Sequence, residues 1–151
     1  MIKAIRTNSD NPDFIELVKQ LDAYLKVLDG DEHAFYNQLN KIDAIKCVVV
    51  AYEKETAIGC GAIKEFDAGS MEVKRMYTLP GERGKGIASR VLTELEKWSA
   101  EMGFEKCVLE TGKRQPEAIA LYKKMGYLLI PNYGKYAGME NSACFEKKLA
   151  Q

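Results

Sequence analysis

Residues 80 to 89, with the sequence PGERGKGIAS, combine residue types that can bind an anion. Glycines lack a β-carbon, so the backbone can adopt positive φ there and another group can approach it closely. Arg83 and Lys85 add mobile positive charge, and an apolar run with helical spacing follows at once. Because the first turn of a helix has free N–H groups and the positive end of its dipole, this loop can hold a phosphate or a pyrophosphate.

Two other phosphate motifs fit the loop less well, and a simple turn remains an alternative. The nucleoside-triphosphate P-loop needs GxxxxGK followed by Ser or Thr, which is not present here. The dinucleotide fingerprint GxGxxG is broken at Ser89, and the loop does not follow the first strand of the chain. A solvated turn that uses a glycine to begin a helix would have the same composition, so both interpretations stay open at this point.

The segment before the loop is predicted to be a strand that ends at Pro80. Its alternation places successive side chains on opposite faces. We expect Met71, Val73, Arg75 and Tyr77 on one face, and Glu72, Lys74, Met76 and Thr78 on the other.

The rest of the chain supplies the elements that must position this loop. Helical spacing predicts helices over residues 12–28, 87–102 and 116–125, and a shorter helix over residues 34–42. Apolar and β-branched runs predict strands near residues 2–7, 45–53, 56–66, 106–112, 127–133 and 141–149. The strand, glycine loop, helix and strand in the middle predict a βαβ unit with parallel strands, flanked by antiparallel hairpins. The fold class is therefore α/β, a single mixed central sheet flanked by helices, and residues 1–151 are predicted to form one domain.

Composition argues against several classes of protein. Lys plus Arg and Asp plus Glu both number 22, so the neutral chain is a poor candidate for binding nucleic acid. The four cysteines show no CxxC spacing and the single histidine is His33, so we expect no metal site and reduced cysteines in the core. The N-terminus lacks the apolar segment of a signal peptide, and the longest strongly apolar run, CVVVAY, is too short for a bilayer. These features predict a cytoplasmic protein without membrane contact.

Two motifs in the second half of the chain resemble the GNAT superfamily of acyl-CoA-dependent N-acetyltransferases. The central motif of that family, Gln/Arg-x-x-Gly-x-Gly/Ala, reads here from Arg83 to Ala88 as RGKGIA. The preceding VKRMYTLP resembles the fourth strand of the family, and the later QPEAIALYKKMGY resembles its second hallmark. The terminal NSACFEKKL is similar to the last strand of many members, so the resemblance covers about residues 45 to 149.

The resemblance implies acetyl-CoA as cosubstrate and assigns a binding set. The backbone N–H groups of residues 84 to 89 would hold the pyrophosphate, and the backbone of Met76 and Thr78 would pair with the pantetheine arm. An amide near Met76 would polarise the thioester carbonyl, which requires the fourth and fifth strands to diverge. Gln115 stands where many members carry an asparagine that contacts the cofactor. The implied cofactor-binding residues are Met76, Tyr77, Thr78, Arg83, Gly84, Lys85, Gly86, Ile87, Ala88, Ser89, Gln115 and Tyr122.

The resemblance also implies catalytic residues. Tyr122 matches the family tyrosine that protonates the leaving thiolate, although core packing is an alternative role for it. Glu72 is the candidate general base, with Glu110 and a water chain as rivals and a solvated surface carboxylate as the plain alternative. His33 lies in the variable region that often forms the acceptor wall, and an ordinary surface residue is the plain alternative for it. No Ser-His-Asp or Cys-His set is evident, which favours direct attack over a covalent acyl-enzyme.

The expected function is therefore acetyl-CoA-dependent transfer of an acetyl group to a small-molecule or peptide primary amine. The alternative is a non-catalytic acyl-CoA-binding sensor or regulatory module, which would keep the glycine loop and would not need Tyr122. The identity of the acceptor would depend on residues 11–45 and 131–141, where we find no recognisable motif. A homodimer formed through an edge strand is compatible with the sequence.

Overall fold

The computed structural model describes residues 1–30 and 45–149. Two short 3₁₀ turns, η2 and η3, accompany the strands and helices, and the predicted order of elements is confirmed within these ranges. The helix predicted over residues 34–42 and His33 lie outside the described residues. The elements are β1 (Ile2–Thr7), α1 (Pro12–Asp29), β2 (Cys47–Glu53), β3 (Thr56–Asp67), β4 (Ser70–Thr78), η2 (Pro80–Glu82), α3 (Ile87–Glu101), β5 (Lys106–Gly112), α4 (Pro116–Lys124), β6 (Leu128–Ile130), η3 (Gly134–Tyr136) and β7 (Ser142–Lys148).

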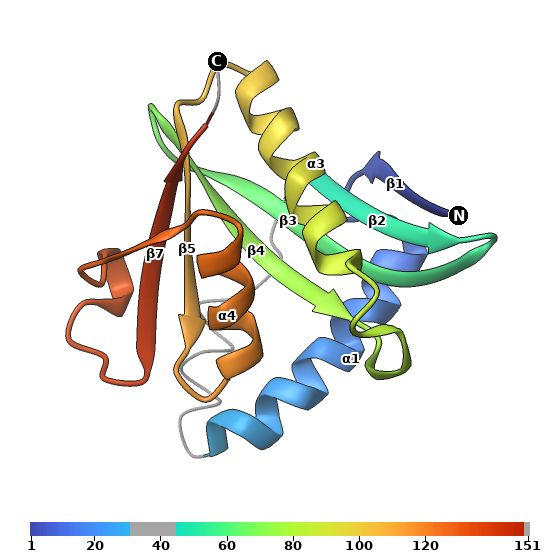
Figure 1. The fold of residues 1–151 in the computed structure, drawn as a ribbon, viewed down its shortest axis with the longest axis horizontal. Coiled ribbons are helices and arrows are strands. Elements are labelled where there is room, and N and C mark those ends of the chain that lie inside the picture. The colour runs from blue at the N-terminus through green and yellow to red at the C-terminus, as the bar shows by residue number, and fades with distance from the viewer. Residues whose placement is uncertain (31–44, 150–151) are drawn as a thin grey trace.

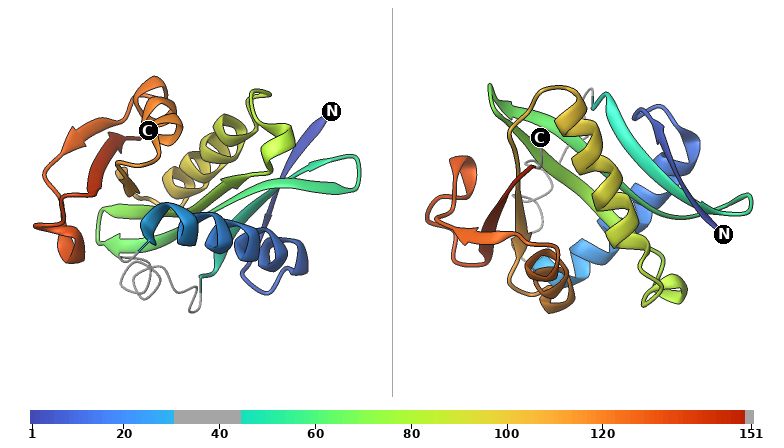
Figure 2. Two further views of the ribbon diagram at one scale, coloured as in Figure 1. Left: turned by 90° about the horizontal axis from the view of Figure 1, so that it is seen from below. Right: turned by 45° about the horizontal axis from the view of Figure 1, so that its top comes forward.

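Seven strands form one sheet in the order β1-β2-β3-β4-β5-β7-β6. Strands β4 and β5 are parallel, and every other neighbouring pair is antiparallel. Helix α1 covers one face of the sheet, and α3 and α4 lie on the opposite side (Figures 1 and 2). The predicted class, a single mixed sheet flanked by helices, is confirmed.

Each face of the sheet has its own apolar core. Leu92 and Leu95 of α3 pack on one face together with Val49 of β2. Phe14 of α1 packs on the other face with Val48 and Val50 of the same strand. The alternating valines of β2 are therefore buried on both sides, which explains why this strand has no polar face.

Capping residues set where the helices begin. The Asn11 side chain accepts hydrogen bonds from the backbone N–H groups of Asp13 and Phe14 at 2.8 and 3.0 Å, and Pro12 opens α1. Pro116 likewise opens α4. Helix α3 begins directly after Gly86, as the glycine loop predicts.

A β-bulge in β4 makes the predicted alternation of that strand wrong. Tyr77 pairs with Cys60 and Lys74 pairs with Ala62, so Arg75 and Met76 together face the single residue Gly61. Arg75 has φ 59°, in the left-handed region.

The extra residue reverses the faces that follow it. Met71 and Val73 belong to the core under α3, whereas Tyr77 belongs to the core under α1. Arg75 also turns toward α1, where it contacts Asp22. Glu72, which alternates with Met71 and Val73, therefore shares the α1 side of the sheet with Arg75 and Tyr77.

The parallel strands β4 and β5 touch only at one end. Residues Ser70 to Glu72 pair with Lys106 to Val108. Beyond this point the two strands diverge, and α4 lies beside the opening (Figure 1). Residues 73–78 of β4 therefore have no strand partner on the β5 side within the described part of the chain.

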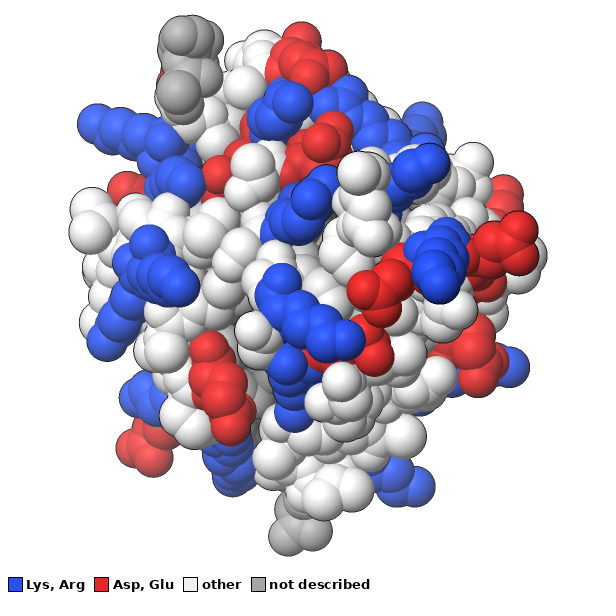
Figure 3. Space-filling view, turned by 45° about the vertical axis from the view of Figure 1, so that its right-hand side comes forward, with Lys and Arg blue, Asp and Glu red and all other residues white. Residues whose placement is uncertain are grey.

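The surface carries charges of both signs, and they are interspersed on the face shown in Figure 3. Among residues 1–30 and 45–149, no helix has the length and apolar character needed to cross a membrane. The same residues contain no group of three or more His, Cys, Asp or Glu side chains that could hold a metal ion. All four cysteines are free thiols, and Cys60, Cys107 and Cys144 are buried.

Candidate active site

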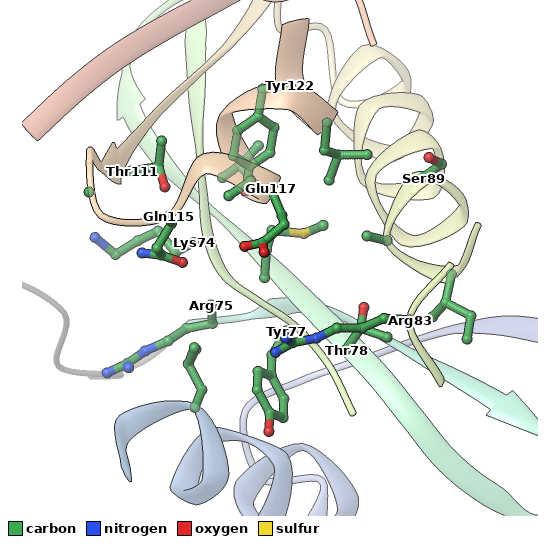
Figure 4. Close-up of a pocket in the computed structure, with 18 of the residues that line it drawn as sticks. Lys74, Arg75, Tyr77, Thr78, Arg83, Ser89, Thr111, Gln115, Glu117 and Tyr122 are labelled. Carbon is green, nitrogen blue, oxygen red and sulfur yellow. The ribbon is translucent and has the colours of Figure 1, made fainter. Parts of the chain in front are cut away.

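A cavity of about 510 Å³ opens where β4 and β5 diverge. Its walls come from α1, the glycine loop, the start of α3, the end of β5 and α4 (Figure 4). The cavity thus joins the loop predicted to bind a phosphate to β4, the strand that the resemblance assigns to the pantetheine arm.

The glycine loop has the backbone that an anion site needs. Gly84 and Gly86 have φ values of 85° and 77°, which other residues rarely adopt. Nothing lies within 4 Å of where a β-carbon would stand at either position, so the space beside the loop is open. The first intrahelical bond of α3 runs from the Arg90 N–H to the Gly86 carbonyl, which leaves the N–H groups of residues 87–89 without helical partners. This geometry fits a pyrophosphate.

The two basic residues of the loop lie differently. The Arg83 guanidinium lies 5.4 Å from the centre of the Tyr24 ring on α1, so it reaches across the cavity that both residues line. Lys85 instead pairs with Glu82 at 2.9 Å and does not line the cavity. Arg83 is therefore the loop cation in place to meet a bound anion.

Tyr122 lies in the cavity wall with its ring directed inward (Figure 4). Its ring packs edge-on against Tyr127, with centroids 5.8 Å apart, and tilted against Phe145 at 6.4 Å. Burial raises the pKa of the Tyr122 hydroxyl well above its usual value, and the negative charge of Glu110 raises it further. The neutral phenol is thus favoured, which is the form that can donate a proton.

Glu72 lies on the α1 side of the cavity, and each of its two carboxylate oxygens contacts a polar side chain. The Tyr133 hydroxyl donates a hydrogen bond of 2.8 Å to one oxygen, and Lys74 Nζ lies 3.4 Å from the other. Burial, followed by the charge of Glu72, raises the pKa of Tyr133. Glu110 also lines the cavity, so its carboxylate is available to an incoming amine as well.

The comparison with known proteins decides the family. The model of the acetyltransferase (GNAT) family matches residues 13–127. The chain belongs to the GNAT acetyltransferase family. Acetyl-CoA-dependent acetyl transfer is the general reaction of this family.

Relatives of this GNAT chain are known by sequence and by structure. It is 34% identical over 137 residues to the IAA acetyltransferase of Azospirillum brasilense, covering 89% of this chain and 90% of the relative. It is 40% identical over 110 residues to YjgM of Escherichia coli, an uncharacterized N-acetyltransferase, covering 71% of this chain and 58% of the relative. A solved structure from Klebsiella pneumoniae, assigned as an acyl-CoA N-acyltransferase, superposes with a TM-score of 0.83, 28% identity and 99% coverage of both chains. The PaiA N-acetyltransferase of Thermoplasma acidophilum, solved with coenzyme A, has the same fold with a TM-score of 0.72, 20% identity and coverage of 98% of this chain and 99% of that one.

Most residues that the sequence singled out in this GNAT chain line this cavity. The exception within the loop is Lys85. The lining residues among them are Glu72, Met76, Tyr77, Thr78, Arg83, Gly84, Gly86, Ile87, Ala88, Ser89, Glu110, Gln115 and Tyr122.

The structure adds cavity residues that sequence reasoning missed. Glu117, in the first turn of α4, extends into the cavity (Figure 4), and Tyr136 of η3 lines its α1 side. Tyr133, which holds Glu72, comes from the same PNYGKYAGMEN segment as Tyr136. The available signal was the loop itself, which carries two tyrosines three positions apart, because binding and catalytic residues often lie on loops held by a rigid scaffold.

Proposed function

We propose that this protein is an N-acetyltransferase in which a primary amine attacks the thioester of acetyl-CoA directly, and that residues 1–151 form a single domain. The cavity that connects the glycine loop, the unpaired edge of β4 and Tyr122 is the observation that supports this proposal most strongly. In this arrangement an anion-binding loop, an extended backbone edge and a candidate proton donor would all face the same cavity.

The described residues fit coenzyme A at the loop end of the cavity. The N–H groups of residues 87–89 and the guanidinium of Arg83 would hold the pyrophosphate, with the positive end of the α3 dipole behind them. The unpaired edge of β4 near Met76 and Thr78 would accept the pantetheine arm as an added strand. The acyl group would then lie beside the bulge, where a backbone N–H can stabilise the developing oxyanion.

Tyr122 is proposed to protonate the departing thiolate. A thiolate is a better leaving group when it gains a proton. The Tyr122 hydroxyl is protonated at neutral pH, because the ordinary pKa of tyrosine is about 10 and burial raises the pKa of Tyr122 above that value. The position of the ring in the cavity wall supports the enzyme over the sensor module, which would need no proton donor there.

Glu72 is proposed to accept the proton that the attacking amine must lose. An alkylamine is protonated at neutral pH, because its pKa is about 10.4 in a lysine-like environment. Glu72 holds its carboxylate toward the cavity through Tyr133 and Lys74. Glu110 lines the same cavity and is the alternative base, and a water chain could connect either one to the amine.

The test measures binding and turnover separately. Acetyl-CoA at one hundred times its dissociation constant should stabilise the fold by about 2.7 kcal/mol, whereas NAD at the same concentration should not. Purified protein with acetyl-CoA and a panel of primary amines should release free thiol, and mass spectrometry should find the acetylated amine. Stabilisation by acetyl-CoA with no acetylated product from any amine would favour the sensor module instead.

A further inference from the structure

The side chain of Arg75 is a buried cation that the reaction described above does not use. It leaves β4 at the bulge, its side chain is only 4% exposed, and it lines the α1 side of the cavity. Figure 4 shows it extending toward α1 and away from Tyr122. It therefore shares the α1 side of the cavity with Glu72, the proposed base for the acceptor amine.

Within the part of the chain that the structure describes, Arg75 has a hydrogen-bond donor that no acceptor uses. Its Nη1 atom lies 2.7 Å from an oxygen of Asp22, which is itself 37% exposed. Its Nε atom is buried and has no hydrogen-bond partner in the described part of the chain. Buried N–H groups without an acceptor are rare in folded proteins, and on a charged group they mark a place where an acceptor group is expected.

The backbone at Arg75 has a strained conformation. A φ of 59° inside a strand is a sparsely populated conformation for a residue with a side chain. Such conformations persist where the surrounding structure enforces them, and they concentrate at functional sites. Here the bulge turns Arg75 toward α1 at the position where β4 passes the cavity.

An acceptor with its own carboxylate fits these groups. The edge of a guanidinium that includes Nε binds a carboxylate through parallel N–H bonds, and Arg is the side chain best suited to it. Lys74, the preceding residue, lines the same cavity and adds a second positive charge. Glu72 and Glu110 provide the negative charge that a protonated amine would meet.

Resting on the proposed function, we infer that the acceptor is an amino acid or a similar amino-carboxylate, whose carboxylate binds at the Nε edge of Arg75. The amine of such a molecule would face the carboxylates of the cavity. Arg75 would act as a specificity-determining residue and would take no part in proton transfer.

The wild-type protein tests this with matched acceptors. The probes are the standard amino acids, their α-carboxamides and the corresponding decarboxylated amines, each with saturating acetyl-CoA. For the best acceptor, kcat/KM should be about 10- to 100-fold higher for the amino acid than for its carboxamide, the range expected for one charge-assisted contact. The amine of the carboxamide is the less basic and so loses its proton more easily, which means that amine reactivity alone would give the opposite order.

Two variants then assign the preference to Arg75. Arg75→Gln should lower kcat/KM about 10- to 100-fold for the amino acid, leave the carboxamide unchanged and leave the KM for acetyl-CoA within about twofold. Arg75→Lys should lose most of the preference as well, because lysine keeps the charge and lacks the Nε edge. Arg6→Gln is the matched control, because Arg6 also pairs with carboxylates but lies outside the cavity, and it should leave the preference intact.

Three results would contradict the carboxylate site, and they separate its failure from failure of the proposed acetylation. If the carboxamides or the decarboxylated amines are acetylated as well as the amino acids or better, amine acetylation stands and the carboxylate site is wrong. An unchanged preference in folded Arg75→Gln would mean that another group binds the carboxylate. If no amine of any class is acetylated while acetyl-CoA still binds, the proposed function itself fails, and the inference fails with it.

Discussion

Met76 fills the space beside Gly61 that a side chain would need: a β-carbon on Gly61 would lie 2.5 Å from Met76 Sδ. It would also lie 2.8 Å from Val91 and 2.9 Å from Leu95 of α3. Gly61 faces the bulge formed by Arg75 and Met76, so the missing side chain makes room for both the bulge and the helix. The bulge that shapes the cavity therefore depends on a glycine in the neighbouring strand.

Gly61→Ala should lower the free energy of unfolding by about 1–3 kcal/mol, the usual range for overpacking a core. Met76 is flexible, but Val91 and Leu95 are fully enclosed and cannot retreat easily. Urea unfolding followed by circular dichroism measures the change. Gly81→Ala is the control, since nothing lies within 4 Å of a β-carbon there, and equal stability of the two variants would contradict this explanation.

Gly86→Val should weaken acetyl-CoA binding at least about tenfold, because a β-branched residue opposes the positive φ that directs the loop N–H groups at the ligand. Gly103→Val is the control, because Gly103 also has a positive φ, 91°, with nothing within 4 Å of its β-carbon position. Gly103 does not line the cavity. Both variants should lose about 1–2 kcal/mol of stability. Calorimetric titration should find weakened binding in Gly86→Val alone, and equal weakening in Gly103→Val would remove the phosphate role of the loop.

Tyr122→Phe should lower kcat about 10²- to 10⁴-fold, the range for loss of a general acid, with acetyl-CoA affinity and melting temperature little changed. Tyr127→Phe loses the same atom from the adjacent ring. The Tyr127 hydroxyl donates to Glu96 at 2.8 Å outside the cavity, so that variant should lose about 1 kcal/mol of stability and keep its turnover. Full activity in Tyr122→Phe would show that the ring serves packing alone.

Glu72→Gln should lower kcat about 10²- to 10⁴-fold at neutral pH, because the amide cannot accept the amine proton. Its rate should recover as pH rises and the amine loses its proton to solvent. Glu146→Gln removes a carboxylate that pairs with Lys106 at 3.1 Å and does not line the cavity, so it controls for a lost ion pair. A larger loss in Glu110→Gln than in Glu72→Gln would transfer the base assignment to Glu110.

Two buried thiols should contribute to a loss of stability in alkaline solution. Burial raises the pKa of Cys60 to about 12 and that of Cys107 to about 11, from an ordinary value of 9.0. The unfolded chain then releases these protons at lower pH than the folded chain does, so the stabilisation is complete below pH 9 and is lost as pH rises toward the folded pKa values. Each thiol should contribute about 1.4 kcal/mol per pH unit within that window.

Urea unfolding between pH 8 and pH 11 at about half-unit steps measures this slope. Cys60→Ala should lose stability at every pH and should show a shallower decline above pH 9 than the parent protein. A decline of equal steepness in Cys60→Ala would mean that the thiol has no part in it.

Local sequence signals predicted the element order and the loop, because those signals act over a few residues. Asn11 and Pro12 mark a helix start wherever they occur, and Gly86 allows the positive φ before α3. The proposed phosphate site could be predicted for the same reason, since its candidate donors are consecutive backbone groups.

The bulge and the acceptor side of the cavity could not be predicted from the sequence. Strict alternation places Arg75 and Tyr77 on the same face as Met71. No residue type within β4 indicates the β-bulge. The determinant is Gly61 on another strand together with the side chains of α3, which only the fold brings together. Tyr133 reaches Glu72 from 61 positions away, so its role also depends on tertiary structure.

The divergence of β4 and β5 has a mechanical consequence. Strands β1 to β4 form one panel and strands β5, β7 and β6 form another, and the panels share only the three pairs between Ser70–Glu72 and Lys106–Val108. Such a joint transmits force at one end and leaves the other end free to open by bending. A molecule lying in the gap and bonded to both sides acts as a strut between the panels, so hydrogen exchange across β4 and β5 should slow together when acetyl-CoA binds.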